Sequence, residues 1–175
     1  MSYTYRHLPH WIPEEVDVFV TWRLAGSLPC KDEELDRDVT GPRWLQGARI
    51  AQMIADALLF GEKTRHLYDL HAWVIMPNHV HIILRPRGEL ASILRWLKSR
   101  TGRVANRILG RTGMAFWQDE SYDHWVRTTK ELEALIAYVE NNPVNAALVE
   151  APDLWHWSSA CGKTDDKIRS PVLLA

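Results

Sequence analysis

The chain has 175 residues, 46% of them hydrophobic, which is enough for one domain with a proper core over residues 1–160 and a polar tail at 161–175. Two cysteines exclude a disulfide-rich scaffold. The absence of a charged-then-apolar leader, and of an apolar run of about 18 residues, favours an unexported cytoplasmic protein with no membrane partner. The net charge of −1 by itself argues against a nucleic-acid-binding protein.

The first part of the chain is expected to contain one strand and one helix. Residues 1–15 are rich in aromatic residues, histidine and proline and indicate an irregular arm. Residues 16–24 alternate in the way that is typical of a strand. An acidic loop follows over 26–42. Residues 43–60 then carry the apolar spacing of a helix, which Gly61 would end.

Two short apolar segments at the centre of the chain predict a pair of strands. They cover 70–76 and 79–84 and are joined at Met76-Pro77-Asn78. Residues 89–109 then place apolar side chains on one helical face, although a glycine at position 102 leaves room for a bend or break. Residues 116–127 are aromatic and partly alternating, which favours a strand with a loop.

The last predicted helix starts at a cap provided by Thr128 or Thr129 and runs to about Asn141, where Pro143 would end it. A tryptophan-rich turn at 155–159 follows. The order of elements is strand, helix, two strands, helix, strand, helix. This order predicts an α+β sandwich with helices packed on a mainly antiparallel sheet.

Two histidines separated by one residue lie in the second strand of the central pair. Because side chains alternate across a strand, His79 and His81 share a face. The apolar residues of this strand point the other way: Val80, Ile82 and Leu84. Two imidazoles on one face can converge on one divalent metal ion, but the same spacing also fits sheet histidines that are hydrogen-bonded to neighbours. Two ligands alone do not make a metal site.

Tyr138 and Asn142 lie four residues apart in the last predicted helix, which puts them on one side of it. Tyr138 falls at the edge of the apolar face and could reach from the core boundary into a site. Asn142 offers an amide oxygen to a metal ion, and its position before a proline predicts that it lies just past the last turn. An ordinary boundary tyrosine and a C-terminal helix cap are the alternative interpretations.

A basic segment at 85–111 contrasts with the rest of the chain. It holds eight basic residues and one acidic residue, a net charge of +7, which leaves −8 on the other residues. Such a band suits the phosphate backbone of a nucleic acid, with a solvated helix surface as the alternative. We expect DNA contacts from seven of its members: Arg85, Arg87, Arg95, Lys98, Arg103, Arg107 and Arg111.

Together these residues describe one chemistry. A metal ion on two histidines and an amide oxygen would polarise a phosphate, a tyrosine hydroxyl would attack it, and a basic groove would hold the strand. Several aromatic residues are expected to pack in or beside the core, with stacking on unpaired bases as the alternative. They are Trp117, Tyr122, Trp125, Trp155 and Trp157.

Three segments resemble the REP-associated tyrosine transposases, a group within the single-tyrosine HUH transposase superfamily. They are 72–81 (AWVIMPNHVH), 116–124 (FWQDESYDH) and 138–149 (YVENNPVNAALV). The arm at 5–11 and the turn at 157–159 also fit. The resemblance therefore spans nearly the whole chain, including all of the candidate site.

The resemblance implies a ferredoxin-like α+β domain that nicks and joins single-stranded DNA near palindromic hairpin repeats. By position, His79 and His81 would be metal ligands and Asn142 the third, for Mg²⁺ or Mn²⁺, although the two nitrogens also suit Zn²⁺. Tyr138 would be the nucleophile, forming a 5′-phosphotyrosine and freeing a 3′-hydroxyl. The active unit is left open as a monomer or a homodimer, so Tyr138 could serve the histidines of its own chain or of a partner.

The chain departs from the family pattern at Asn145 and Ala147, where the family often has Lys and Gly, so a phosphate contact at these positions is not carried over. Two other functions stay open. One is a non-catalytic protein that binds DNA hairpins and retains the motif. The other is a small-molecule metal hydrolase, which would leave the basic helix without a role. The transposase interpretation requires that the helix of Tyr138 packs on the histidine face of the sheet.

Overall fold

The computed structural model describes residues 16–27 and 41–161. Its four strands form one antiparallel sheet in the order β2-β3-β1-β4. The strands are β1 (Val18–Arg23), β2 (Tyr68–Ile75), β3 (His79–Pro86) and β4 (Tyr122–Trp125). The helices are α1 (Ala48–Lys63), α2 (Leu90–Ile108) and α3 (Thr129–Asn145), with 3-10 turns at Trp44–Gln46 and Pro152–Leu154.

The element order β1-α1-β2-β3-α2-β4, combined with this strand order, is the ferredoxin-like arrangement. The predicted α+β class is therefore confirmed. The predicted arm at 1–15, most of the acidic loop and nearly all of the polar tail lie outside the described residues, so the division at residue 160 stays a prediction. No helix in the described part of the chain is both long and apolar enough to cross a membrane.

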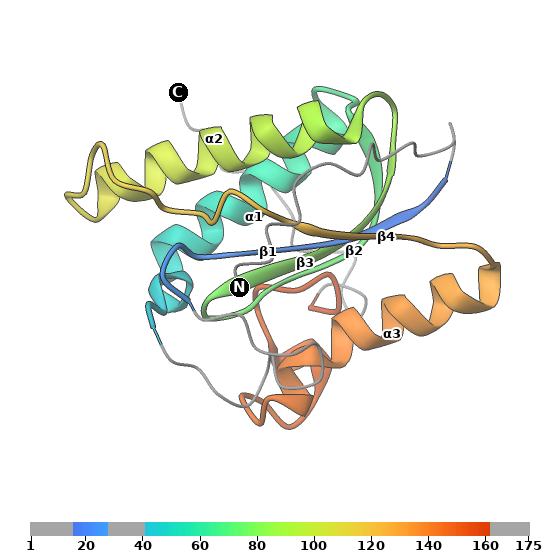
Figure 1. Ribbon diagram of the computed structural model, residues 1–175. Helices are drawn as coiled ribbons and strands as arrows, with labels where there is room; N and C mark the ends of the chain where they lie inside the picture. The colour runs from blue at the N-terminus through green and yellow to red at the C-terminus, as the bar shows by residue number, and fades with distance from the viewer. Residues whose placement is uncertain (1–15, 28–40, 162–175) are drawn as a thin grey trace, which may run out of the picture.

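The sheet separates two hydrophobic cores. Figure 1 shows α1 and α2 on one face of the sheet and α3 on the other. Val80 and Ile82 of β3 belong to the core under α1 and α2, whereas Ile83 packs in the core under α3 together with Phe19 and Val139. This split confirms the alternation predicted for β3, because successive side chains of a strand point to opposite faces.

The two outer strands of the sheet differ in whether their outer sides are hydrogen-bonded to another segment. The outer side of β2 is covered by the tryptophan-rich turn: the Ile75 N–H donates to the Trp157 carbonyl at 2.8 Å, and the Ser159 N–H donates to the Trp73 carbonyl at 2.9 Å. β4 forms the opposite edge, and no segment within 16–27 and 41–161 pairs with its outer side. The described sheet therefore has one covered edge and one open edge.

Two glycines predicted to interrupt helices lie inside them instead. Gly61 does not end α1, which continues to Lys63. Gly61 is buried against Tyr68, and a Cβ atom there would clash with the Tyr68 hydroxyl, so packing explains the glycine. Gly102 does not break α2, and a Cβ atom there would approach Trp117 Cδ1 at 3.3 Å. Both positions accept glycine because a neighbouring aromatic ring takes the space of the side chain.

The third helix starts as predicted but ends later. Thr128 caps it by accepting a hydrogen bond from the Glu131 N–H at 3.1 Å. Pro143 does not end the helix, which runs on to Asn145, because proline near a C-terminus removes one backbone bond while its φ stays helical. Asn142 therefore lies within α3, one turn after Tyr138, and not past its last turn.

Candidate active site

The two histidines of β3 face each other in the interior. The Nε2 atoms of His79 and His81 are 3.0 Å apart, and the rings lie at 76° to each other. Their residues are 2% and 0% exposed. Two polar rings buried this deeply need partners for all of their nitrogen atoms, because an unsatisfied buried polar group costs about 1–3 kcal/mol.

The outer nitrogen of each imidazole has a side-chain partner. The Nδ1 of His79 lies 2.7 Å from the Asn78 Oδ1, and the Nδ1 of His81 lies 2.7 Å from the Thr21 hydroxyl. An amide oxygen only accepts, so His79 donates through Nδ1 and its Nε2 presents a lone pair. If His81 donates to Thr21 in the same way, both Nε2 lone pairs point to one place. Such outer partners are how proteins orient histidine ligands.

Both imidazoles are held neutral. Burial lowers the pKa of His79 well below its ordinary value, and the charges of His81 and Arg23 lower it further. Burial, with a further effect from Arg23, lowers the pKa of His81 to about 3. Near neutral pH both rings are therefore uncharged, which is the form of histidine that binds metal ions.

The histidine pair fits a divalent ion. Two ligand nitrogens about 2.1 Å from an ion and at right angles to each other are about 3.0 Å apart, which is the separation of the two Nε2 atoms. In the described part of the chain, His, Cys, Asp and Glu form no group of three or more that could hold a metal ion. A third protein ligand would therefore be of another type, and Asn142, which is 0% exposed, offers an amide oxygen from α3.

Tyr138 lies on the histidine face. Its ring centroid is 5.8 Å from that of His81 and 6.1 Å from that of Phe19. Phe19 in turn stacks on His81, at 5.5 Å and 22°. The requirement that the helix of Tyr138 packs on the histidine face is thus confirmed, and it is met within one chain. Tyr138 is only partly buried, so its ring is both held in place and accessible from outside.

Four residues around this site were not predicted from the sequence. Thr21 and Asn78 hold the outer nitrogens of the histidines, Phe19 supports the ring of His81, and Arg23 supplies positive charge. Alternation along β1 puts Phe19, Thr21 and Arg23 on one face, which is a signal in the sequence. Their pairing with β3, such as Thr21 opposite His81, depends on a strand register that the sequence does not reveal.

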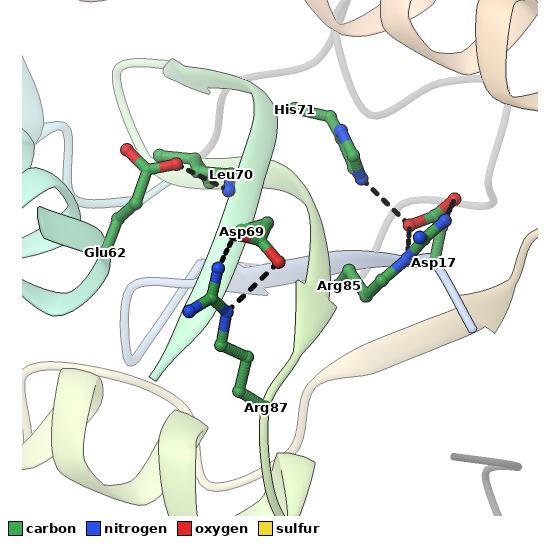
Figure 2. Close-up of polar contacts among 7 residues, drawn as sticks. All are labelled: Asp17, Glu62, Asp69, Leu70, His71, Arg85 and Arg87. Carbon is green, nitrogen blue, oxygen red and sulfur yellow. Dashed lines mark hydrogen bonds and ion pairs between the residues drawn. The ribbon is translucent and has the colours of Figure 1, made fainter. Parts of the chain in front are cut away.

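Two of the predicted DNA contacts form ion pairs at the far end of the sheet (Figure 2). Arg85 donates to both carboxylate oxygens of Asp17 at 2.8 Å, and His71 lies 2.8 Å from the same carboxylate. Arg87 pairs with Asp69, with 3.1 Å between Nε and Oδ2. Both arginines are exposed, so they can contact solvent while holding these carboxylates.

The other predicted contacts belong to α2 and the turn after it. Arg95, Arg103 and Arg107 are exposed on α2. Lys98 is tied to the backbone carbonyl of Asp119 at 2.8 Å, and the Arg111 guanidinium lies 3.8 Å from the centre of the Trp44 ring. Because α2 packs on the face opposite α3, these cations are not brought together with Tyr138 (Figure 1). The aromatic residues divide as well, since Trp117 is buried whereas Tyr122 and Trp125 on β4 are 54% and 41% exposed.

Comparison of the sequence with known proteins identifies the family of this chain. The model of a family described as "Transposase IS200 like" matches residues 50–142, which is more than half of the chain. The chain belongs to the IS200-like transposase family. The matched region begins in α1, contains both histidines and Tyr138, and ends at Asn142. The whole candidate site on β3 and α3 therefore lies within it.

Two proteins illustrate the similarity. A REP-associated tyrosine transposase of Escherichia coli K12 is 26% identical over 110 residues, which cover 62% of this chain and 63% of that protein. The alignment therefore spans less than two thirds of the length of this relative. A solved structure of a REP-associated tyrosine transposase bound to a REP hairpin superposes with a TM-score of 0.63 at 24% identity, covering 90% of this chain and 82% of that one. The second comparison shows that the fold is shared.

Proposed function

We propose that this protein is a metal-dependent enzyme that nicks single-stranded DNA at palindromic hairpin repeats and transfers the strand through a 5′-phosphotyrosine on Tyr138. One observation carries the proposal. The ring of Tyr138 lies 5.8 Å from that of His81, on the face where two neutral imidazoles converge to 3.0 Å. A tyrosine hydroxyl beside two ligand nitrogens suits metal-assisted phosphoryl transfer to that tyrosine.

The residues of the site take separate roles in this reaction. Tyr138 loses its phenolic proton to solvent, its oxygen forms a bond to the scissile phosphorus, and the bond from phosphorus to the 3′ oxygen breaks. The departing 3′ oxygen takes up a proton and leaves as a hydroxyl. Arg23 carries a positive charge close enough to lower the pKa of both histidines, so it can attract the phosphate and counter its growing charge. Attack by a 3′-hydroxyl on the phosphotyrosine reverses these steps and joins a new strand.

The histidines provide the place for a metal ion. His79 and His81, with Asn142 as third ligand, would hold Mg²⁺ or Mn²⁺. A bound ion supplies Lewis-acid polarisation of the scissile phosphate. Asn78 and Thr21 keep the two imidazoles oriented toward each other, and burial keeps both rings uncharged. Phe19 and the sheet keep water away from the inner side of the rings.

Hairpin DNA is proposed as substrate on two grounds. The relative from Escherichia coli is named a REP-associated tyrosine transposase, and the solved structure with the same fold is described as bound to a REP hairpin. The chain itself supplies exposed arginines on α2, which suit a phosphate backbone and make the affinity sensitive to salt. The partner is thus single-stranded or hairpin DNA, and the nucleophile and histidines of one chain suffice for one site.

A covalent-adduct assay tests the proposal. The protein is incubated with a labelled DNA hairpin carrying single-stranded flanks and Mn²⁺, and a denaturing gel reveals any protein–DNA adduct. Tyr138→Phe should abolish the adduct and leave hairpin binding intact. Tyr122→Phe is the matched control, since the Tyr122 ring also packs on Phe19, with 6.3 Å between the ring centroids, but Tyr122 lies on β4. Adducts that survive Tyr138→Phe would identify another nucleophile, and hairpin binding without adducts under any divalent ion would support the non-catalytic binding protein.

A further inference from the structure

A groove lies on the face of the fold opposite the histidines, between α2 and the segment 112–121 that leads into β4. Its volume is about 690 Å³, and residues from both segments line it. Pockets for small ligands are typically about 300–1,000 Å³, so the groove is large enough for a nucleotide. It is independent of the candidate active site, with which it shares no residue.

Side chains of α2 hold the two walls of the groove together. Lys98 donates to the Asp119 carbonyl at 2.8 Å and to the Ser121 hydroxyl at 3.2 Å. Farther along the helix, the Asn106 amide nitrogen donates to the Met114 carbonyl at 2.6 Å. The groove between these two contacts is therefore preformed, so that binding a ligand does not cost the free energy of opening it.

The lining of the groove combines an apolar floor with a cationic rim. Phe116 and Trp117 form an apolar floor and are 3% and 7% exposed, and both lie next to Gly102 of α2. Arg95 and Arg103 are exposed on the rim, and neither forms an ion pair with another residue of the described ranges. An apolar floor beside guanidinium groups suits the base and the phosphates of an unpaired nucleotide.

Asn106 adds an unused hydrogen-bond acceptor. Its amide oxygen is buried and accepts no hydrogen bond from the described residues, although its amide nitrogen is engaged with Met114. A buried acceptor without a donor costs about 1–3 kcal/mol. The exocyclic amino group of a base would supply the missing donor.

The groove also has a route to the candidate active site. Ser121 lines the groove, and the next residue, Tyr122, contacts Phe19 on the histidine face at 6.3 Å. Tyr122 is 54% exposed on β4, the open edge of the described sheet, whereas the tryptophan-rich turn covers the other edge. A DNA strand held in the groove can therefore pass around β4 to Tyr138.

We propose that this groove binds one unpaired nucleotide of the DNA substrate. Arg95 and Arg103 hold the phosphates on either side of it, its base packs on the apolar floor, and Asn106 accepts a hydrogen bond from the amino group of an adenine or cytosine. The identity of the ligand as DNA rests on the proposed function. The groove then positions the substrate on one face of the sheet while the chemistry takes place on the other.

Photocrosslinking locates the nucleotide. A single-stranded oligonucleotide with one 5-iododeoxycytidine is irradiated with the full-length protein, and crosslinked peptides are identified by mass spectrometry. We expect crosslinks within residues 112–121, at Met114 or the neighbouring aromatic residues. Crosslinks confined to other parts of the chain would overturn the proposal.

A pair of double variants tests the rim. Arg95→Ala with Arg103→Ala should weaken binding of the oligonucleotide at least about tenfold more than Arg100→Ala with Arg107→Ala, which removes the same charge from the same helix outside the groove. Equal weakening by both double variants would show general electrostatic attraction and contradict the proposal. Replacing adenine by purine, which lacks the amino group, should lower the affinity of the wild type several-fold, and an unchanged affinity would rule out the contact with Asn106.

The adduct assay separates this inference from the proposed function. Tyr138→Phe, which changes the proposed nucleophile and nothing in the groove, should form no adduct but should keep the crosslinks within 112–121. In the wild type, adducts together with crosslinks outside 112–121 would refute only the groove. Crosslinks of the wild type within 112–121 without any adduct would refute the nicking function and leave the groove standing as a binding site.

Discussion

The two faces of the sheet use the same strand for different purposes. On the α3 face, β3 presents His79 and His81, which are buried, neutral and directed at each other. On the other face, Val80 and Ile82 are buried in the core under α1 and α2. Residues next to each other in sequence thus belong to a site and to a core. The difference predicts that the proposed activity and the stability can be altered separately by changing alternate residues of one strand.

The largest effect is expected from removing a histidine. His81→Ala should lower Mn²⁺-dependent adduct formation more than about 100-fold, because a bound ion contributes several kcal/mol to phosphate activation. The variant should remain folded, since the apolar core on the other face is untouched. Adduct yield on denaturing gels and circular dichroism measure the two effects. Full activity in a folded variant would show that the histidines only pack.

The neighbouring residue should behave in the opposite way. Ile82→Ala removes a fully buried side chain from the core under α1 and α2 and should lower the free energy of unfolding by about 2–5 kcal/mol. Adduct formation per folded molecule should stay close to that of the wild type at a temperature well below unfolding. Urea denaturation and the adduct assay provide the two measurements. A large loss of adduct formation without loss of stability would contradict the idea that alternate residues of β3 serve the site and the core separately.

The sequence predicted much of this arrangement, because the alternation of side chains in β3 is visible in its own sequence and does not depend on which strands lie beside it. The placement of His79 and His81 on one face, and of Val80 and Ile82 on the other, needed nothing more. The resemblance to known transposases pointed to Tyr138, which alone would pass for an ordinary boundary residue of a helix. The later end of α3 was missed, since proline is a helix breaker only where the lost N–H bond matters.

Other features depend on contacts between distant parts of the chain. Thr21 supports His81 only because β1 and β3 pair in one particular register, and a shift by one residue would turn its side chain to the other face. The basic segment was recognised as one band along the sequence. In the fold its members separate, since Arg85 neutralises Asp17 at the end of the sheet while Arg95 and Arg103 border a groove beside α2. Charge counts along a sequence do not reveal which face of a sheet the charges will occupy.

A smaller effect is expected from the residue that orients His81. Thr21→Val removes the hydroxyl that lies 2.7 Å from the His81 Nδ1 and should lower the affinity for Mn²⁺ about tenfold, as is typical for the outer partners of histidine ligands. Thr101→Val is the matched control, because the Thr101 hydroxyl is also buried but lies on the other face, where it donates to the Leu97 carbonyl and accepts from the Trp117 indole N–H. It should leave the affinity unchanged. Calorimetric titration measures the Mn²⁺ affinity of both variants. An equal loss of affinity in both would show that the hydroxyl beside His81 has no specific effect on metal binding.

The smallest effect concerns the polar end of the sheet, remote from the histidine pair. Burial alone would raise the pKa of Asp17, but hydrogen bonds from Arg85 and His71, with their charges, lower it below its ordinary value. The Asp17 side chain is 10% exposed and Arg85 shields it (Figure 2). Asp17→Asn should therefore lower the free energy of unfolding by about 1 kcal/mol at pH 7, the usual net contribution of such hydrogen bonds.

The pH dependence of this loss identifies its cause. A carboxyl whose pKa is lowered by folding stabilises the protein fully above its unfolded pKa of about 3.8, and this contribution is lost as the pH falls through the lower folded value. The difference between the wild type and Asp17→Asn should therefore shrink as the pH falls below about 4. Asp69→Asn is the control, because its pair with Arg87 is 45% and 52% exposed and solvent screens it, so its stability should match that of the wild type. Urea denaturation at a series of pH values measures this difference in the free energy of unfolding. A difference that persists at the lowest pH values would mean that Asp17 acts through packing and not through its charge.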